Sequence, residues 1–342
     1  MPRRVSMQTI ADSLRLSKFA VSRALSGKTG VSEETRRDVL AAARALGYRL
    51  PRGAADAPPS ESTAGGAAYA LIWMDPTMQR ESSYWARLLA GASTACLDIG
   101  WESAVVAPRP DAAPTFPPYM DRAACAGHIA VGRLPAETLA ALQAMGGPLV
   151  LLDHEEPVVR ADAVLNANAD GAELLTNHLL FAGRRSFVFV GHDDFAPSFR
   201  ERWRGCRQAI EAFGSAKDAR LRKWTVPYAA SRWADGLHAK LAALGGAEER
   251  PDAFVCANDH IALELLVGLR RIGVRVPDDC AVVGFDNVEA AASAEPPLTT
   301  VELAKEALGR RAVEQLARRR ERAGEPPEKV LLSPRLIVRA SG

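Results

Sequence analysis

The sequence predicts a small all-α head followed by a larger α/β core built on parallel sheets. Two observations carry this prediction. Apolar residues recur at helical spacing over the first 50 residues, whereas beyond residue 68 short apolar runs alternate with helical stretches. A third observation separates the two regions: residues 51–67 are rich in Pro, Gly, Ala and Ser and lack large apolar side chains, which is typical of a linker.

The charge is distributed unevenly along the 342 residues, although the whole chain carries only +2. Residues 1–52 contain eleven Lys and Arg residues against four acids, a net charge of +7, which leaves −5 for the remainder. A basic head on a mildly acidic body is typical of a nucleic-acid-binding module joined to a domain with another ligand. The hydrophobic content of 48% excludes a disordered chain.

The five cysteines are scattered and form no C-x-x-C pair, so the sequence predicts neither a disulfide framework nor a zinc site. We expect them to be reduced thiols in the cytoplasm. The basic start of the chain is not followed by an apolar signal segment, and no apolar run reaches membrane-spanning length. These features predict a soluble cytoplasmic protein with no metal, no cofactor and no membrane partner.

The apolar spacing predicts three short helices in the head, at 6–14, 17–25 and 33–46, each with a serine placed to cap its start. A brief turn at Arg15 and Leu16 separates the first two helices. Two helices joined in this way, with a third behind them, form helix-turn-helix architecture, in which the second helix enters the major groove of DNA.

The second predicted helix carries polar residues suited to reading DNA. Val21 and Leu25 fall on its packing face, while Lys18, Ser22 and Arg23 lie on the other. Arg and Lys donate to guanine edges in the major groove, and Ser can serve either base type. A solvated amphipathic helix is the alternative for this stretch alone, and the helix-turn-helix context favours DNA. The DNA-binding candidates are Lys18, Phe19, Ser22, Arg23, Ser26 and Lys28.

Beyond the linker, the alternation of strands and helices predicts parallel sheets with right-handed crossovers. The predicted strands are 69–74, 102–107, 128–131, 149–152, 187–190, 253–256 and 281–285. The predicted helices are 83–98, 135–145, 170–181, 199–213, 232–244 and 259–272.

Acids and amides directly follow several of these strands, at the edge where open α/β sheets bind ligands. Each one alone can equally cap the following helix, and only their shared location favours a site. Together with aromatic faces and one Arg, they can hold a sugar, a sugar acid or a nucleoside-like molecule. The effector-binding candidates are Asp75, Trp85, Asp153, Arg202, Asn258 and Asp286.

Five motifs follow one another along nearly the whole chain. They are LSKFAVSRALSGKTGVSEETR at 16–36, LGYR at 46–49, PDAFVCAND at 251–259, VPDDCAVVGFDN at 276–287 and PPLTTV at 296–301. With them the chain resembles the lactose-repressor/galactose-repressor (LacI/GalR) family of bacterial transcription regulators. Members of that family act as homodimers or higher forms on palindromic operators, most often as repressors, with an effector bound in the core.

The resemblance implies a helix-turn-helix domain at 1–50, a hinge at 51–67 and an effector-binding and dimerisation core at 68–342. The core is expected to be like type I periplasmic binding proteins, with two lobes on doubly wound parallel sheets. The expected first lobe spans about 68–165 and 297–322, and the expected second lobe about 166–296 and 323–342.

By position, the resemblance implies that Lys18, Phe19 and Arg23 read bases. It also implies that Trp85, Asp153, Arg202, Asn258 and Asp286 contact the effector. Because no heptad extension follows residue 339, a dimer is expected rather than a tetramer.

Four positions depart from the family pattern. Arg15 stands where the turn usually has Gly, and Ala20 stands where a Thr is usual. Ala57 occupies the place of the hinge Leu that wedges into the minor groove, so we expect little bending of the operator. Leu303 replaces a usual polar residue, which predicts an absent or apolar effector contact there.

Enzyme signals in the sequence are weak. His154-Glu155-Glu156 and His260 with Glu264 do not reproduce H-E-x-x-H, and Gly27-Lys28-Thr29 lacks the earlier glycine and the strand of a phosphate-binding loop. The sequence therefore predicts a ligand-responsive regulator without catalytic residues. The alternative is a small-molecule sensor with weakened or non-specific DNA binding, which the changes at Arg15, Ala20 and the hinge leave open.

Overall fold

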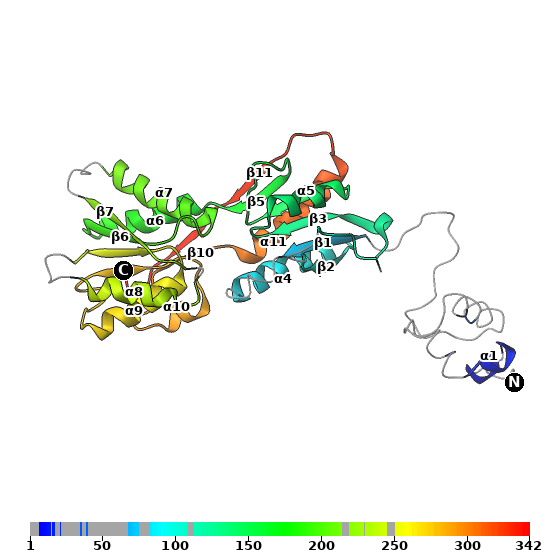
Figure 1. Ribbon diagram of the computed structural model, residues 1–342, viewed down its shortest axis with the longest axis horizontal. Helices are drawn as coiled ribbons and strands as arrows, with labels where there is room; N and C mark the ends of the chain where they lie inside the picture. Colours follow the sequence, from blue (N-terminus) through cyan, green and yellow to red (C-terminus); the bar gives the residue numbers. More distant parts are fainter. Residues whose placement is uncertain are drawn as a thin grey trace. The chain divides into compact units, whose positions relative to one another are not determined.

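The computed structural model describes residues 7–14, 16–17, 21, 35, 39, 68–74, 82–108, 113–118, 120–213, 219–228, 230–244 and 250–342. The chain divides into two compact units, Met1–Ala64 and Gly65–Gly342, which we describe separately (Figure 1). The hinge at 51–67, with Ala57, lies outside the described residues, as do Arg15 and Ala20. None of the described helices combines the length and apolarity that crossing a membrane requires.

The first unit contains helix α1 (Met7–Leu14) and a small apolar core. Ile10 and Ala11 of α1 pack in this core with Val21 and Val39, and all four are fully buried. Val21 and Val39 lie on the packing faces that the apolar spacing predicts for the second and third helices of the head. Helix α1 ends where the amide of Leu16 bonds to the carbonyl oxygen of Ala11 (3.0 Å).

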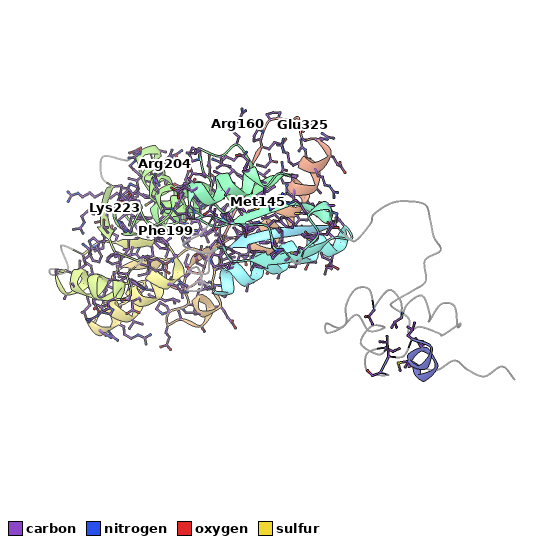
Figure 2. The ribbon with its side chains drawn as sticks, turned by 45° about the vertical axis from the view of Figure 1, so that its right-hand side comes forward. Met145, Arg160, Phe199, Arg204, Lys223 and Glu325 are labelled. Carbon is purple, nitrogen blue, oxygen red and sulfur yellow. The ribbon has the colours of Figure 1, made fainter. Side chains whose placement is uncertain are left out.

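The second unit is built on two parallel sheets and a small antiparallel pair (Figure 1). The larger sheet has the order β11-β5-β4-β3-β1-β2. Its strands are β1 (Tyr69–Met74), β2 (Glu102–Val106), β3 (Cys125–Val131), β4 (Leu149–Leu152), β5 (Asp162–Asn166) and β11 (Lys329–Leu332). Side chains fill both faces of this sheet (Figure 2). Helix α5 (Ala136–Ala144) packs on one face, while α4 (Ser82–Asp98) and α11 (Lys305–Glu321) pack on the other.

The smaller parallel sheet has the order β7-β6-β8-β9 and a core rich in phenylalanine. Phe187, Phe189 and Phe254 are fully buried in it. Its strands are β6 (Ser186–Gly191), β7 (Arg220–Thr225), β8 (Ala253–Cys256) and β9 (Ala281–Val283). The helices around it are α6 (Asn168–Phe181), α7 (Pro197–Ala212), α8 (Trp233–Ala242), α9 (Asp259–Arg271) and α10 (Glu289–Ser293).

The chain passes between the two sheets more than once, after β5, before α11 and after β11. The antiparallel pair of β10 (Thr300–Glu302) and β12 (Arg335–Ile337) lies along these connections. The position of strand β11 differs from the expectation that residues 323–342 belong to the second lobe. Residues 329–332 instead pair in parallel with Ala163–Asn166 of β5 and complete the larger sheet. The fold class is confirmed: both main sheets are parallel, with helices packed against them.

Helices α4 and α11 approach each other closely through two glycines. A Cβ atom at Gly309 of α11 would overlap the carbonyl oxygen of Leu88, and one at Gly91 of α4 would overlap that of Glu306. Because neither glycine carries a side chain, the backbones of the two helices can come into contact. The pair carries Tyr84 and Lys305 in the first turns of its two helices, and so fixes the positions of these two side chains.

Candidate functional site

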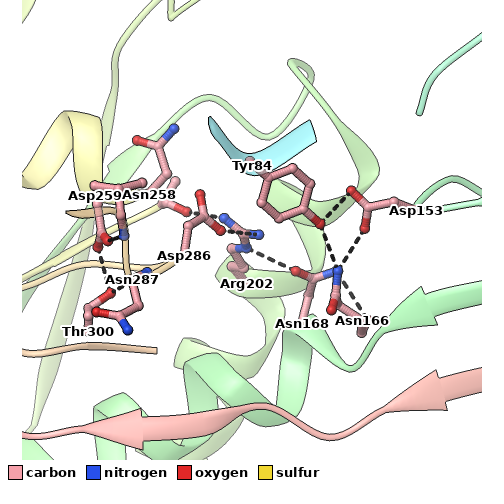
Figure 3. Close-up of polar contacts among 12 residues, drawn as sticks. Tyr84, Asp153, Asn166, Asn168, Arg202, Asn258, Asp259, Asp286, Asn287 and Thr300 are labelled. Atoms are coloured by element: carbon pink, nitrogen blue, oxygen red, sulfur yellow. Dashed lines mark hydrogen bonds and ion pairs between the residues drawn. The ribbon is translucent and has the colours of Figure 1, made fainter. Parts of the chain in front are cut away.

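Polar side chains from both sheets gather where the parallel strands end (Figure 3). The members of this cluster are Tyr84, Asp153, Asn166, Asn168, Arg202, Asn258, Asp259, Asp286, Asn287 and Thr300. Carboxyl ends of parallel strands are the edge at which open α/β sheets bind ligands. The structure thus brings together four of the six predicted effector residues, Asp153, Arg202, Asn258 and Asp286.

Asp153 forms a closed set of hydrogen bonds with Tyr84 and Asn166. It follows β4 with a positive φ of 59°, a conformation that Asp tolerates better than most residues. The hydroxyl of Tyr84 donates to Oδ2 (2.9 Å), and Nδ2 of Asn166 donates to Oδ1 (2.8 Å). Burial raises the pKa of Asp153 to about 6, although both of these hydrogen bonds favour the carboxylate. The carboxyl can therefore change charge near neutral pH.

Trp85 packs beside this group in the core. Its ring meets that of Tyr84 edge to face, with centroids 4.8 Å apart, and only 8% of the residue is exposed. Tyr84 supplies the hydroxyl that reaches Asp153. A role for Trp85 in effector binding stays a prediction.

Arg202 of α7 links the two halves of the cluster and is buried. Its Nε donates to Oδ1 of Asn168 (3.0 Å) and its Nη1 to the carbonyl oxygen of Ala257 (2.6 Å). Its Nη2 lies 3.2 Å from Oδ1 of Asp286 as an ion pair. The guanidinium also stacks over Phe285, 3.8 Å from the ring centroid. These contacts use each nitrogen of the guanidinium and hold it in one orientation.

Asp286 follows β9 in a strained backbone segment that a lysine supports. Asp286 and Asn287 have positive φ values of 109° and 46°. The Nζ atom of Lys305 on α11, which is almost fully buried, donates to the carbonyl oxygen of Asp286. Burial raises the pKa of the Asp286 carboxyl, while Arg202 and Lys305 oppose the rise.

Asn258 and Asp259 lie at the start of α9, where the sequence left a capping role open. Oδ1 of Asn258 accepts from the amide of Ile261 (3.0 Å), so Asn258 does cap the helix. Asp259 is fully buried and accepts from the hydroxyl of Thr300 (2.6 Å) and the amide of Val288 (2.9 Å). Burial raises the pKa of Asp259 to about 7, reinforced by the charge of Asp286.

Sequence reasoning did not identify Asn166 and Asn168 of the cluster or the adjacent Lys305. Its effector candidates also left out Tyr84, Asp259, Asn287 and Thr300. Asn166 and Asn168 lie at the end of β5 and the start of α6, and they were overlooked because β5 was not predicted. The rule that ligands bind after strands would have found both once that strand was placed. Lys305 gave no signal, because nothing local shows that it is buried. Leu303 is buried, as an apolar replacement allows.

An aromatic cavity lies at the same edge of the smaller sheet. Tyr228 follows β7 and His260 lies in the first turn of α9, with the Tyr228 hydroxyl 3.1 Å from Nδ1 of His260. With Trp233 of α8 they line a cavity of about 390 Å³. The sequence predicted no effector role for His260, and its spacing to Glu264 does not reproduce H-E-x-x-H. In the described part of the chain, no group of three or more His, Cys, Asp or Glu residues could hold a metal ion.

A second cavity, of about 820 Å³, opens at the amino ends of β4 and β5. Arg160 and Glu325 line it (Figure 2). Within it Arg319 forms two hydrogen bonds to the buried carboxylate of Asp162. Its Nε donates to Oδ2 (2.7 Å) and its Nη2 donates to Oδ1 (2.5 Å). These ends are opposite to the edge at which parallel sheets bind ligands, so the cavity is separate from the predicted site.

Asp75 lies outside the described residues, and so do all six DNA-binding candidates: Lys18, Phe19, Ser22, Arg23, Ser26 and Lys28.

The fold and the polar cluster define a class of protein with a helical head and a ligand-binding core of two α/β lobes. Residues 6–50 match the family described as bacterial regulatory proteins, lacI family, and residues 176–342 match a periplasmic binding protein-like domain. The HTH-type transcriptional regulator reg1 of Streptomyces lividans is 31% identical, over 97% of this chain and 95% of that one. The chain belongs to the LacI family and is a transcriptional regulator.

Two further relatives also match over nearly the whole chain. The HTH-type transcriptional regulator MalR of Streptomyces coelicolor is 30% identical, over 97% of this chain and 95% of the relative. A solved structure described as the transcriptional regulator CelR–cellobiose complex has a TM-score of 0.63 at 24% identity, covering 99% of this chain and 100% of that chain. The structural likeness supports the fold.

Proposed function

We propose that this protein is a cytoplasmic, non-enzymatic repressor that binds a palindromic operator as a homodimer. Its affinity for the operator is switched by a small polar effector, a sugar or sugar derivative, held in the polar cluster of the core. The helix-turn-helix head supplies the DNA contacts, from Lys18, Phe19, Ser22, Arg23, Ser26 and Lys28. Asp75, Trp85, Asp153, Arg202, Asn258 and Asp286 supply the effector contacts.

The observation that carries this proposal is the buried polar cluster itself. Burying carboxylates and a guanidinium costs free energy unless they are paired, and groups with perturbed pKa values gather at functional sites. Asp153 and Asn166 come from the larger sheet, whereas Arg202 and Asp286 come from elements of the smaller one. A ligand that bonds to both halves favours one arrangement of the two lobes over others, and this difference in affinity is what an allosteric switch requires.

One structural neighbour supports a sugar as the effector, because the CelR structure is described with cellobiose bound. Hydroxyl groups of a sugar suit the carboxylates and amides of the cluster, and the rings of Tyr228 and Trp233 offer apolar faces nearby.

The full chain tests this function in two steps. Operator sites are first selected from random DNA, and sugars and metabolites are then screened by thermal shift, since a specific ligand raises stability by mass action. The ligand found is added to an anisotropy titration of the selected operator. We expect it to change the operator affinity at least about fivefold. A ligand that stabilises the protein but leaves DNA affinity unchanged would point to the alternative, a sensor with weak DNA binding.

The proposed base contact of Arg23 gives a separate prediction. Arg23→Ala should relax the preference at one base position of each half-site by about 1–3 kcal/mol, because a bidentate contact to guanine is lost. The matched variant Lys28→Ala should weaken all sequences alike and reduce the slope of log affinity against log salt by about 1. Anisotropy on single-base operator variants at several salt concentrations measures both. Equal loss on every sequence for Arg23→Ala would refute its base-reading role.

A further inference from the structure

The cavity at the amino ends of β4 and β5 is bounded by a chain segment that Arg319 holds in place. Beyond its two hydrogen bonds to Asp162, Arg319 donates to the carbonyl oxygens of Glu325 and Pro326, the latter at 2.9 Å. The amide of Glu328 also donates to Oδ1 of Asp162 (2.6 Å). The segment between α11 and β11 is therefore tied to the start of β5, and the cavity of about 820 Å³ is a formed part of the fold.

The acidic side chains that line this cavity already have cationic partners. Asp162 is 1% exposed and forms an ion pair with Arg319. Glu325 forms ion pairs with Arg318 and Arg322, both at 3.3 Å. Neither carboxylate therefore needs a further arginine to neutralise it.

Two other arginines of the lining, Arg160 and Arg320, have no acidic partner in the described part of the chain. Arg160 precedes β5, and its backbone is positioned by Gln143, whose Nε2 donates to its carbonyl oxygen (3.1 Å). Arg320 lies in the last turn of α11, with its guanidinium over the ring of Trp101 at 5.8 Å from the centroid. A contact with a ring face uses none of the guanidinium N–H donors. Both side chains can therefore donate to an anion.

The rest of the lining suits the uncharged part of a small molecule. Pro148, Pro326 and Pro327 offer apolar surfaces, and Gly147 and Gly324 carry no side chain. A Cβ atom at Gly324 would meet nothing within 4 Å, so the space around it is open. A volume of about 820 Å³ lies within the usual range of small-molecule sites.

This cavity and the polar cluster lie at opposite edges of the larger sheet. Strands β1, β3, β4 and β5 are parallel, so their amino ends share the edge at which the chain enters the sheet at Tyr69. The polar cluster lies where the strands end (Figure 3). A molecule in the cavity and an effector in the cluster can therefore be bound at the same time.

We propose that this cavity is a second ligand site, which binds a small organic anion through carboxylate or phosphate groups that accept hydrogen bonds from Arg160 and Arg320. The planar guanidinium donates to either group through two parallel N–H bonds, so both chemistries fit. The proline surfaces favour an organic anion over inorganic phosphate. This inference depends neither on the proposed effector nor on the proposed DNA contacts.

Calorimetric titration of the full chain tests the inference with citrate, fructose 1,6-bisphosphate, glucose 6-phosphate and inorganic phosphate. We expect at least one of the three organic anions to bind at least about tenfold more tightly than inorganic phosphate. Tightest binding of citrate assigns the site to carboxylates, and tightest binding of a sugar phosphate assigns it to phosphates. Binding of none of the three organic anions overturns the inference.

Substitutions in the lining locate the binding. Arg160→Gln and Arg320→Gln should each weaken binding of that anion about tenfold, because each removes a charge-assisted hydrogen bond. Both residues are exposed, so we expect the variants to fold. The control Arg204→Gln removes an exposed arginine of α7 that has no ion pair in the described part of the chain (Figure 2), and it should leave binding unchanged.

The basic head also attracts anions, but it is identical in all these proteins and cannot cause a difference between them. An affinity for the anion that survives both cavity substitutions overturns the inference. So does a loss that is as large in Arg204→Gln as in the cavity variants.

Discussion

Tyr84 stands at the centre of the larger sheet's half of the cluster, donating to Asp153 and accepting from Asn166. Tyr84→Phe should lower the free energy of unfolding of the core by about 1–3 kcal/mol, because it leaves buried polar groups unpaired. The control Tyr69→Phe removes a hydroxyl that donates to the carbonyl oxygen of Asp121 (2.6 Å) in a partly exposed place. It should cost about 0.5–1.5 kcal/mol. Urea unfolding measures both, and an equal cost would contradict the special position of Tyr84.

Asp259 gives the protein a pH dependence whose sign can be worked out. Burial raises the pKa of this carboxyl from an ordinary 3.8 to about 7, so between these values the folded chain keeps a proton that the unfolded chain has lost. The free energy of unfolding therefore falls as pH rises from 4 to 7, by up to about 1.4 kcal/mol per pH unit from this group.

Asp259→Asn removes that contribution. The slope of unfolding free energy against pH, measured by urea titrations between pH 4.5 and 6.5, should become more positive than in the unaltered protein. Asp194→Asn, at a side chain 90% exposed, should leave the slope as it was. Parallel curves for Asp259→Asn and the unaltered chain would contradict the raised pKa.

The meeting of the predicted site residues was predictable where strand ends could be placed, while their role as effector contacts stays a prediction. Asp153, Asn258 and Asp286 follow buried apolar strands, so their meeting at one edge was predictable from sequence. The pairing of Arg202 with Asp286 was not, because a helix residue reaches its partner only through packing of α7. Lys305 could not be found for the same reason, since its burial depends on contacts across two lobes.

At the scale of the element, contact between α4 and α11 depends on missing side chains. Gly309→Ala should destabilise the core by about 1–3 kcal/mol, although Ala favours a helix, because the new methyl group meets the carbonyl oxygen of Leu88. Gly324→Ala is the control, since nothing lies within 4 Å of its Cβ position, and it should change stability by less than about 0.5 kcal/mol. Thermal unfolding compares the two. Equal stability of both variants would show that the helices separate without cost.

Most elements with clear apolar patterns were predicted, although β5, a short buried strand, was missed. The strands at 69–74, 149–152 and 253–256 match the structure residue for residue, because strands buried on both faces read as continuous apolar runs. Strand β7 reads RLRKWT and lies at a sheet edge, where charges are tolerated. Helix α11 is rich in Arg and Glu, and its buried side shows only once α4 and the larger sheet are in place.

At the scale of the whole molecule, we expect the hinge sequence to determine how far the protein bends its operator. Ala57 stands where the family has a wedging Leu, so we expect the bound operator to bend only weakly. Gel phasing with the selected operator measures the bend. Ala57→Leu should increase the bend angle, and a sharp central kink with the unaltered protein would contradict the prediction.

The place of β11 in the larger sheet has a consequence for synthesis of the chain. The four strands of the smaller sheet come from one continuous stretch, Ser186–Val283, and are therefore synthesised one after another. The larger sheet begins at Tyr69. It is complete only when α11 covers one of its faces and Lys329–Leu332 pairs with the edge of β5. Until these residues are made, the larger sheet, whose strands are synthesised first, lacks part of its cover and one edge strand. An uncovered apolar face and an open strand edge make a nascent chain prone to aggregation, so we expect this half of the core to be the more vulnerable during synthesis.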